Sequence, residues 1–348
     1  MTEPGKKTEE MQQAIQQQAG KLLSQVAGYV GLRTIDIGLR FGLLDEIARR
    51  PEGITAEALA TKKGLDPFYA HVWCRSAYAS ELLELGENQT YRLAPFVDKL
   101  LLDQGFPGYI GGISSIMMEP EIFDQFAEKL HSGERTWWDQ CSTSFIQMVS
   151  NTGRPFYTRL IPGGLSKVPL LPDRLAKGGR ILELACGAGI GLVRLAQTYP
   201  QSTITGVDGD ASSLEIAKEA IRQGGLDTRV SLVQSTLEEF SASDEFDVAI
   251  INISMHECRD LEKVTSNVRS ALKPGGYFVI SDIPFPASTE GCRTVPARVM
   301  SGIQFFEALI DDQLLPTQAY VDVLSKHDFR NIENFELTPL HVVIYGQK

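Results

Sequence analysis

The spacing of apolar and polar residues changes along the chain, and this change separates a mainly helical N-terminal part from a part in which strands and helices alternate. From Leu22 to Arg50 apolar residues recur every three or four positions, which is typical of amphipathic helices. Two further helices are predicted over residues 56–63 and 67–85, because each follows a residue suited to an N-cap. Residues 91–93 follow a turn and predict one strand of a small hairpin. The first hundred residues are therefore predicted to be mainly helical.

From Gly178 onward, short apolar strands alternate with amphipathic helices. Ser212–Arg222 and Leu261–Leu272 have the spacing of helices, and two final strands are predicted on either side of Pro339. The other predicted strands are Arg180–Ala185, Thr203–Val207, Val230–Gln234, Asp247–Ile253 and Gly276–Ile280. This alternation predicts an α/β domain with a mainly parallel, Rossmann-like sheet that is covered by helices on both faces.

These patterns predict three segments. Residues 1–105 form an N-terminal helical domain, residues 106–172 a helical linker and substrate lid, and residues 173–348 the α/β domain. The order of elements in the first segment is typical of a winged helix, a fold that often binds DNA. Its third helix, residues 67–85, has Arg75 as its single Lys or Arg, which is too few donors for phosphates and base edges. We therefore interpret this segment as a packing and dimerisation domain.

Composition and charge narrow the classes of function. The 348 residues include 33 Lys and Arg against 44 Asp and Glu, and the net charge of −11 argues against nucleic-acid and anionic-lipid partners. No apolar run approaches the roughly 18 residues of a membrane-spanning helix, and residues 1–20 lack the apolar core of a secretion signal. Five scattered cysteines argue against disulfides and a zinc site. The prediction is a cytoplasmic protein with no membrane partner and no bound metal.

The residues that can carry chemistry lie where the predicted strands end. Gly187 and Gly189 follow the first strand, where they allow a ligand to approach the backbone and leave the N–H groups of the next helix accessible. Leu192 stands where a dinucleotide-binding fingerprint would have its third glycine. Glu183 on the first strand would attract an ammonium or sulfonium group, and Asp208 after the second strand would bind ribose hydroxyls. Together they predict a ligand with an amino acid at one end and an adenosine at the other.

At these residues the chain resembles class I S-adenosylmethionine-dependent methyltransferases. Residues 183–189 (ELACGAG) are similar to the family's first motif, Gly206–Asp208 to its ribose-binding acid, and Leu272–Gly276 to the turn before its fifth strand. Residues 39–45 and 54–60 resemble the winged-helix dimerisation domain of small-molecule O-methyltransferases. The resemblance implies a seven-stranded sheet, mostly parallel with an antiparallel last strand. It also implies S-adenosyl-L-methionine as cofactor and a homodimer formed through the N-terminal domain.

The predicted adenine end departs from the family's pattern. Ser235 and Thr236 stand where the family usually has an acid after the third strand, and Gly209 replaces the apolar residue that packs on adenine. We predict that these three residues still line the adenine end and that Asn252 lines the methionine end. Two explanations of the departures stay open: either the affinity for the cofactor is weaker, or other groups compensate.

The candidate general base is His256, just beyond the fourth strand, because an imidazole titrates close to neutral pH. In the O-methyltransferases that the chain resembles, a His-Asp pair occupies this place. Here His256 is followed by Glu257, and Cys258 stands where an aromatic residue is usual. The alternative is that His256 merely lines the pocket. The remaining histidines, interpreted as core or surface groups, are His71, His131, His327 and His341.

Two segments rich in apolar residues, 106–170 and 284–315, are predicted to cover a methyl acceptor. The candidates for this apolar lid are Trp137, Trp138, Phe145, Met148, Phe156, Tyr157, Met300, Phe305 and Phe306. The prediction is therefore transfer of a methyl group to a small apolar or aromatic acceptor, at oxygen, by in-line displacement. Two alternatives stay open: a ligand-sensing winged-helix regulator of transcription, and a cofactor-binding relative that transfers nothing.

Overall fold

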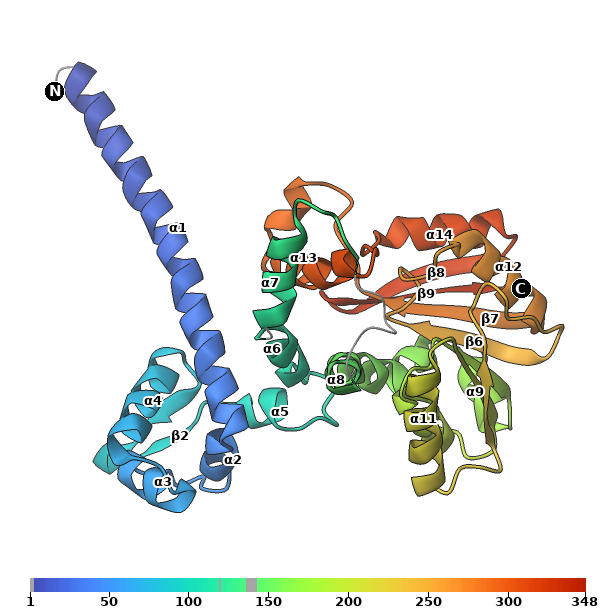
Figure 1. Cartoon of the computed structure of the whole chain (residues 1–348), viewed down its shortest axis with the longest axis horizontal. Coiled ribbons are helices and arrows are strands. Elements are labelled where there is room, and N and C mark those ends of the chain that lie inside the picture. Colours follow the sequence, from blue (N-terminus) through green and yellow to red (C-terminus); the bar gives the residue numbers. More distant parts are fainter. Residues whose placement is uncertain (1–2, 119, 136–142) are drawn as a thin grey trace. The chain divides into compact units, whose positions relative to one another are not determined.

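The computed structural model describes residues 3–118, 120–135 and 143–348, which divide into two units (Figure 1). One unit comprises residues 1–104 and 109–118, and the other comprises residues 105–108 and 119–348. The predicted linker and lid, residues 106–172, contributes residues to both units. None of the helices in the described part of the chain is long and apolar enough to cross a membrane.

The N-terminal unit has the predicted order of elements. The helices are α1 (Glu3–Arg40), α2 (Leu43–Ala48), α3 (Ala56–Lys63), α4 (Pro67–Ala79), α5 (Val97–Leu101) and α6 (Gly111–Met117). Strands β1 (Leu83–Leu85) and β2 (Tyr91–Leu93) form the predicted antiparallel hairpin. The side chain of Thr55 caps α3 and that of Asp66 caps α4. The predicted helix 67–85 was too long, because its last residues pair as β1.

Helix α1 runs much further than the periodic segment that predicted it. It spans 38 residues and ends before Gly42, which has a φ of +60° and begins α2. Near its C-terminal end it packs on α4, where the indole N–H of Trp73 donates to the carbonyl of Thr34 at 3.0 Å. Residues 8–30 of the helix are exposed. Packing within this unit therefore secures the last third of α1.

The second unit is built on the predicted seven-stranded sheet. Its strands are β3 (Arg180–Leu184), β4 (Thr203–Asp208), β5 (Val230–Gln234), β6 (Phe246–Asn252), β7 (Leu272–Asp282), β8 (Arg330–Thr338) and β9 (His341–Gln347). Their order is β5-β4-β3-β6-β7-β9-β8; strands β3 to β7 pair in parallel, and β9 is antiparallel to both neighbours. The direction in which the strands are added reverses between β3 and β6, which is where ligands bind in such sheets.

Helices cover both faces of this sheet, as predicted (Figure 1). Alternate strand residues point to opposite faces. Ile181, for example, packs with α9 (Leu171–Ala176), α10 (Ile190–Thr198) and α11 (Ala211–Gln223), whereas Leu182 packs with α12 (Leu261–Ala271) and α14 (Thr317–Lys326). The remaining helices are α7 (Pro120–Lys129), α8 (Thr143–Arg159) and α13 (Val295–Leu309). The four cysteines in the described residues, Cys74, Cys186, Cys258 and Cys292, form no disulfide.

Candidate active site

A cavity of about 540 Å³ lies at the carboxyl ends of the central strands. It is lined by the residues that follow β3, β4, β5 and β6, together with part of α8. The main lining segments are residues 185–188, 208–210, 236–238, 252–254 and 257–259. This size lies within the range of roughly 300–1,000 Å³ typical of small-molecule sites. The cavity therefore occupies the edge of the sheet at which the topology predicts a ligand.

The glycine turn after β3 is tied to the end of β4 by Asp208. One carboxylate oxygen accepts from the backbone N–H of Gly187 at 2.8 Å, and the other accepts from that of Asp210 at 2.9 Å. Burial raises the pKa of Asp208, and these hydrogen bonds oppose the rise. Gly189 needs to be glycine, since its φ is +78° and an added Cβ would lie 2.9 Å from the Cβ of Ala217. The predicted donor-binding residues Gly187 and Asp208 are thus brought together on the cavity wall.

Glu183 lies behind the cavity wall, in contrast to Asp208. Its side chain is fully buried against Gly191 and Tyr157, and neither carboxylate oxygen has a hydrogen-bond partner among the described residues. Burial raises the pKa of Glu183 to about 8, although the adjacent Tyr157 hydroxyl favours the charged form. Tyr157 and Asn252 line the cavity in this region. Any effect of Glu183 on a ligand is therefore exerted through the field of its charge or through Tyr157.

At the predicted adenine end, too, some of the predicted residues line the cavity and one does not. Gly209 and Thr236 line the cavity, whereas the hydroxyl of Ser235 donates to the carbonyl of Thr236 at 2.8 Å. Leu237, which the sequence reasoning passed over, also lines the cavity. It is the first apolar residue after β5, so its position was the signal that could have found it. An apolar side chain is therefore present at this end although position 209 lacks one.

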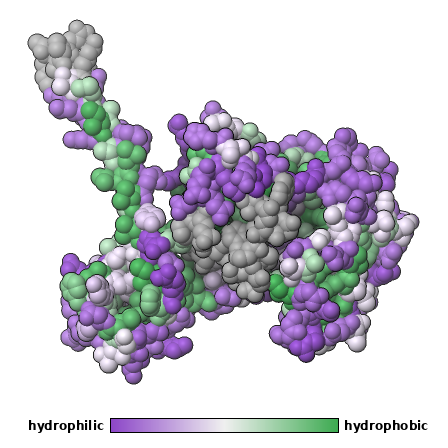
Figure 2. All heavy atoms as spheres, viewed as in Figure 1, coloured by the Kyte–Doolittle hydropathy of each residue, from purple (hydrophilic) through white to green (hydrophobic). Residues whose placement is uncertain are grey.

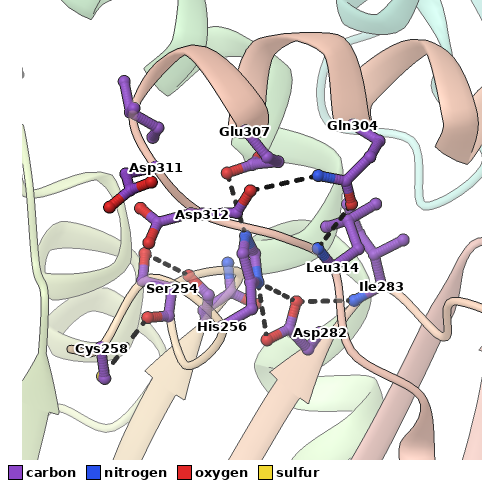
Figure 3. A network of polar contacts seen from close by, with 12 residues as sticks. Ser254, His256, Cys258, Asp282, Ile283, Gln304, Glu307, Asp311, Asp312 and Leu314 are labelled. Carbon is purple, nitrogen blue, oxygen red and sulfur yellow. Dashed lines mark hydrogen bonds and ion pairs between the residues drawn. The ribbon is translucent and has the colours of Figure 1, made fainter. Parts of the chain in front are cut away.

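A buried cluster of polar side chains surrounds His256 (Figure 3). Nδ1 of the imidazole lies 2.9 Å from Oδ1 of Asp282, and Nε2 lies 3.5 Å from Oε2 of Glu307. Asp282 also accepts from the backbone N–H of Ile283 and from the hydroxyl of Tyr320, both at 2.8 Å. The imidazole is 2% exposed and does not belong to the cavity wall. His256 thus sits between two acids that come from distant parts of the chain.

Glu257 occupies a different place from the one that the resemblance implies. The hydrogen-bond and ion-pair partners of His256 are Asp282 and Glu307, whereas Glu257 lines the cavity. Burial raises the pKa of Glu257 to about 8; the charge of Glu307 adds to the rise, and His256 opposes it. Glu257 is therefore the acid of this group that the cavity exposes to a ligand.

Sequence reasoning also missed Asp282 and Glu307, the two partners of His256. Asp282 is the last residue of β7, and the prediction for that strand stopped at Ile280. Glu307 is buried in α13 beside Phe306, in a segment interpreted as an apolar lid. The signal for each was an acid at the end of an apolar strand or inside an apolar helix.

The electrostatics of the cluster favour a protonated imidazole. Burial alone would lower the pKa of His256, but the charges of Asp282 and Glu307 and the hydrogen bonds to them raise it well above 6.5. Burial raises the pKa of the nearby Asp312 to about 7, although Arg259 forms an ion pair with it at 2.8 Å and opposes the rise. The cluster therefore has more acids than bases and holds protons at neutral pH.

The same cluster contains three residues that can ligate a cation. His256, Glu257 and Glu307 each offer a ligand atom, and these atoms lie within 4.8 Å of one another. No local sequence pattern predicts this set of ligands, because Glu307 is 50 residues from Glu257 along the chain. The prediction that the chemistry needs no metal stays a prediction.

The predicted lid residues are distributed over several environments. Tyr157 lines the cavity, whereas Phe156 and Met300 pack in a small buried cluster with Ile283 and Leu314. The ring of Phe305 lies 4.7 Å from that of Phe126, and Phe306 is buried. Trp137 and Trp138, and the side chains of Phe145 and Met148, lie outside the described residues. Of the predicted lid residues whose side chains the structure describes, Tyr157 of α8 is the one on the cavity wall, and the lid itself stays a prediction.

Comparison with known proteins agrees with this geometry. Residues 175–335 match a family model described as a methyltransferase domain. This part of the chain therefore resembles a methyltransferase domain. An uncharacterised methyltransferase of Synechocystis sp. is 30% identical to this chain over 125 residues, which are 35% of this chain and 55% of that relative. The match thus spans about half the length of the curated relative.

Two solved structures extend the likeness in fold over almost the whole chain. An O-methyltransferase family protein from Burkholderia thailandensis has a TM-score of 0.68 at 18% identity and covers 95% of this chain and 98% of its own. Human N-acetylserotonin methyltransferase, solved in complex with S-adenosylmethionine, has a TM-score of 0.66 at 16% identity with the same coverages. Both units of the chain therefore share the fold of this group of methyltransferases.

Proposed function

We propose that this protein transfers the methyl group of S-adenosyl-L-methionine to an oxygen atom of a small apolar or aromatic acceptor. The observation that carries the proposal is one continuous cavity, whose lining includes Gly187 and Asp208 at one end and Glu257 at the other. A donor held at the strand ends would therefore share one cavity with Glu257, which adjoins the buried cluster around His256. Holding donor and acceptor in line supplies most of the catalysis in a displacement of this kind.

The residues present fit this donor. When bound, it supplies a methyl group on a positively charged sulfonium. Asp208 lies where it can accept from ribose hydroxyls, and Thr236 and Leu237 lie beyond it toward β5. Asn252, at the end of β6, has an amide nitrogen that is buried without a partner among the described residues, which suits a ligand carboxylate. Asp208, an acid on the cavity wall, favours a cationic ligand through its charge.

We further propose that His256 is the general base. Because Asp282 binds Nδ1, Nε2 is the nitrogen that can gain and lose a proton. In the structure Nε2 faces Glu307 at 3.5 Å, so a proton can pass between these two groups. Glu257 lines the cavity, and its carboxyl group lies within 4.8 Å of both groups. With the first proton on Glu307, the proton of the acceptor hydroxyl passes through the carboxylate of Glu257 to Nε2.

The chemistry in this proposal requires no metal. Protonated His256 already supplies the positive charge that Asp282 and Glu307 need, and the methyl donor carries its own leaving group. The acceptor is then selected by the apolar residues of α8 and α13. We therefore place a small, largely apolar molecule with an ionisable hydroxyl in the cavity.

We also propose that a second copy of the chain covers α1. Its exposed part carries five apolar residues on one face, at the three-and-four spacing of a helix (Figure 2): Met11, Ile15, Leu22, Val26 and Tyr29. They are 59–60% exposed, and a continuous apolar stripe of this length is typical of a contact surface. In sedimentation equilibrium, the double substitution Leu22→Glu and Val26→Glu should convert a dimer into a monomer. A control on the opposite face of the helix, Gln17→Glu with Ser24→Glu, should leave the dimer intact.

Two measurements test the enzyme itself. Calorimetry should show binding of S-adenosylmethionine and its demethylated product but not of nicotinamide dinucleotides. A panel of phenols and other small hydroxyl compounds, followed by mass spectrometry, should yield the demethylated cofactor together with a methylated product. Binding of the dinucleotides alone would refute the donor. Donor binding without any demethylated product would favour the non-methylating alternative, and a gel shift with DNA at physiological salt would favour the regulator.

A further inference from the structure

A chain of four buried polar side chains leads from α8 to the cavity. The guanidinium Nε of Arg159 lies 3.0 Å from Nδ1 of His341, Nε2 of His341 lies 2.7 Å from the hydroxyl of Ser281, and that hydroxyl lies 2.6 Å from Oδ1 of Asn252. All four residues are at most 9% exposed. Asn252 and Ser281 are register partners on β6 and β7. The chain therefore crosses the ends of three neighbouring strands, β6, β7 and β9.

The direction of every hydrogen bond in this chain is determined by chemistry. Arginine can only donate, so Nδ1 of His341 must accept. Burial, with the charge of Arg159, lowers the pKa of His341 well below 6.5, so the ring is neutral and its proton is on Nε2. That proton is donated to Ser281, whose own proton is donated to the carbonyl oxygen of Asn252. The amide of Asn252 is thereby held with its oxygen toward β7.

At the cavity end of this series of hydrogen bonds, Asn252 has a hydrogen-bond donor without a partner in the described part of the chain. Nδ2 of Asn252 is buried and has no hydrogen-bond partner among the described residues, and Asn252 lines the cavity. A buried donor that stays unpaired is destabilising, and a ligand oxygen would satisfy it. If the amide were turned over, it would present an oxygen to the cavity and would repel a carboxylate.

We propose that His341, with Arg159 and Ser281, is a positioning residue that aims the amide of Asn252 at the carboxylate of the methyl donor. This inference rests on the proposed function, because it takes the donor to be S-adenosylmethionine. Asp208 on β4 would hold the ribose of that donor, and the order β4-β3-β6 places the amino-acid end at Asn252. These hydrogen-bonded side chains then favour methyl donors that have a carboxylate over ligands that lack one.

The first test compares two ligands that differ in the amino-acid part. Calorimetry would use S-adenosylhomocysteine, which has the carboxylate, and 5′-methylthioadenosine, which lacks it. Ser281→Ala should weaken binding of the first about tenfold and leave binding of the second unchanged. The matched control is Ser202→Ala, since Ser202 is equally buried and its hydroxyl donates to the carbonyl of Leu175 at 2.8 Å, away from the cavity. The control should bind both ligands as the parent does.

The second test addresses His341 itself. His341→Phe removes both hydrogen bonds and should raise KM for S-adenosylmethionine about tenfold with kcat within twofold of the parent. His341→Gln keeps an acceptor and a donor and should recover most of the affinity. Equal losses for the two ligands, or no loss in Ser281→Ala, would overturn the inference while leaving the proposed function intact. Failure of the parent protein to bind either ligand would overturn the proposed function, and the inference with it.

Discussion

A titratable side chain lies at or next to each end of the cavity, and the two side chains are held in opposite ways. At the donor end, Asp208 is satisfied by two backbone N–H groups from residues 21 positions before it and 2 positions after it. At the acceptor end, the partners of His256 are side chains 26 and 51 positions further along the chain: Asp282 binds Nδ1, and Glu307 lies 3.5 Å from Nε2, which has no hydrogen-bond partner among the described residues. Backbone donors are present whatever the side chains are, whereas a side-chain cluster exists only if every member is present. The donor end is thus expected to be robust, and the acceptor end sensitive to single substitutions.

The two ends also balance charge differently. The hydrogen bonds from backbone N–H groups oppose the rise in the pKa of Asp208 that burial causes, whereas Glu183 behind it has no such donors. At the acceptor end the single imidazole of His256 neutralises acids on both sides. The difference suits the two tasks: the donor end presents charge to a cation, and the acceptor end stores and moves a proton. Four experiments can break or sharpen this contrast.

The largest effect is expected at the acceptor end. His256→Ala should lower kcat about 10³-fold, because a positioned base contributes roughly 10²–10⁴-fold. The affinity for S-adenosylmethionine, measured by calorimetry, should stay within twofold of the parent. The control is His327→Ala, which removes a histidine that lies 2.7 Å from Glu262, away from the cavity. Unchanged turnover in His256→Ala would show that proximity alone drives the reaction.

At the donor end, Asp208→Ala should weaken binding of S-adenosylmethionine about 50-fold. The loss combines the contact with the ribose and the two hydrogen bonds that hold the glycine turn, each to a charged acceptor. Asp247→Ala is the matched control, since Asp247 accepts from the backbone N–H of Arg180 at 2.8 Å and has no place on the cavity wall. If both variants lost affinity equally, the effect of Asp208 would be general destabilisation.

Glu183→Gln should stabilise the protein without ligand, and the gain should depend on pH. A carboxyl whose pKa rises from 4.5 to about 8 on folding binds more protons in the folded state, so stability falls as pH rises between these values. Glutamine does not titrate, and the gain should therefore grow from near zero below pH 4 to on the order of 4 kcal/mol at pH 8. Denaturant titrations at several pH values measure it. A gain that does not vary with pH would mean that Glu183 is not the cause.

The last experiment, removal of divalent metals, is expected to have no effect on activity. Removal of divalent metals with EDTA should leave kcat and KM unchanged, because the imidazolium of His256 supplies the positive charge of the cluster. Elemental analysis of the purified protein should find no stoichiometric metal. Loss of activity that Zn²⁺ or Mn²⁺ restores would assign His256, Glu257 and Glu307 as ligands instead.

Local patterns predicted where the glycine turn and Asp208 lie, since each of these features depends on a short stretch of chain. The turn at Gly187 and Gly189 follows from the glycines themselves, and Asp208 follows from where an apolar strand ends. The same local reasoning placed Glu183 against the ligand, whereas its side chain is buried beneath α10 behind Tyr157. Strand period shows which face a residue points to, but the depth at which that residue lies depends on the helix packed above it.

The sequence by itself determined the seven-stranded sheet, the order of elements in the N-terminal unit and the glycine turn with its acid, because hydrophobic period, caps and turn residues act over a few positions. The tertiary structure alone decided that Asp282 and Glu307 meet His256. It also decided that Glu257, and not His256, lines the cavity, and that His341 orients Asn252 through Ser281. These contacts join strands and helices that the chain visits far apart. No local pattern records them, since the free energy that forms them comes from burying whole elements against one another.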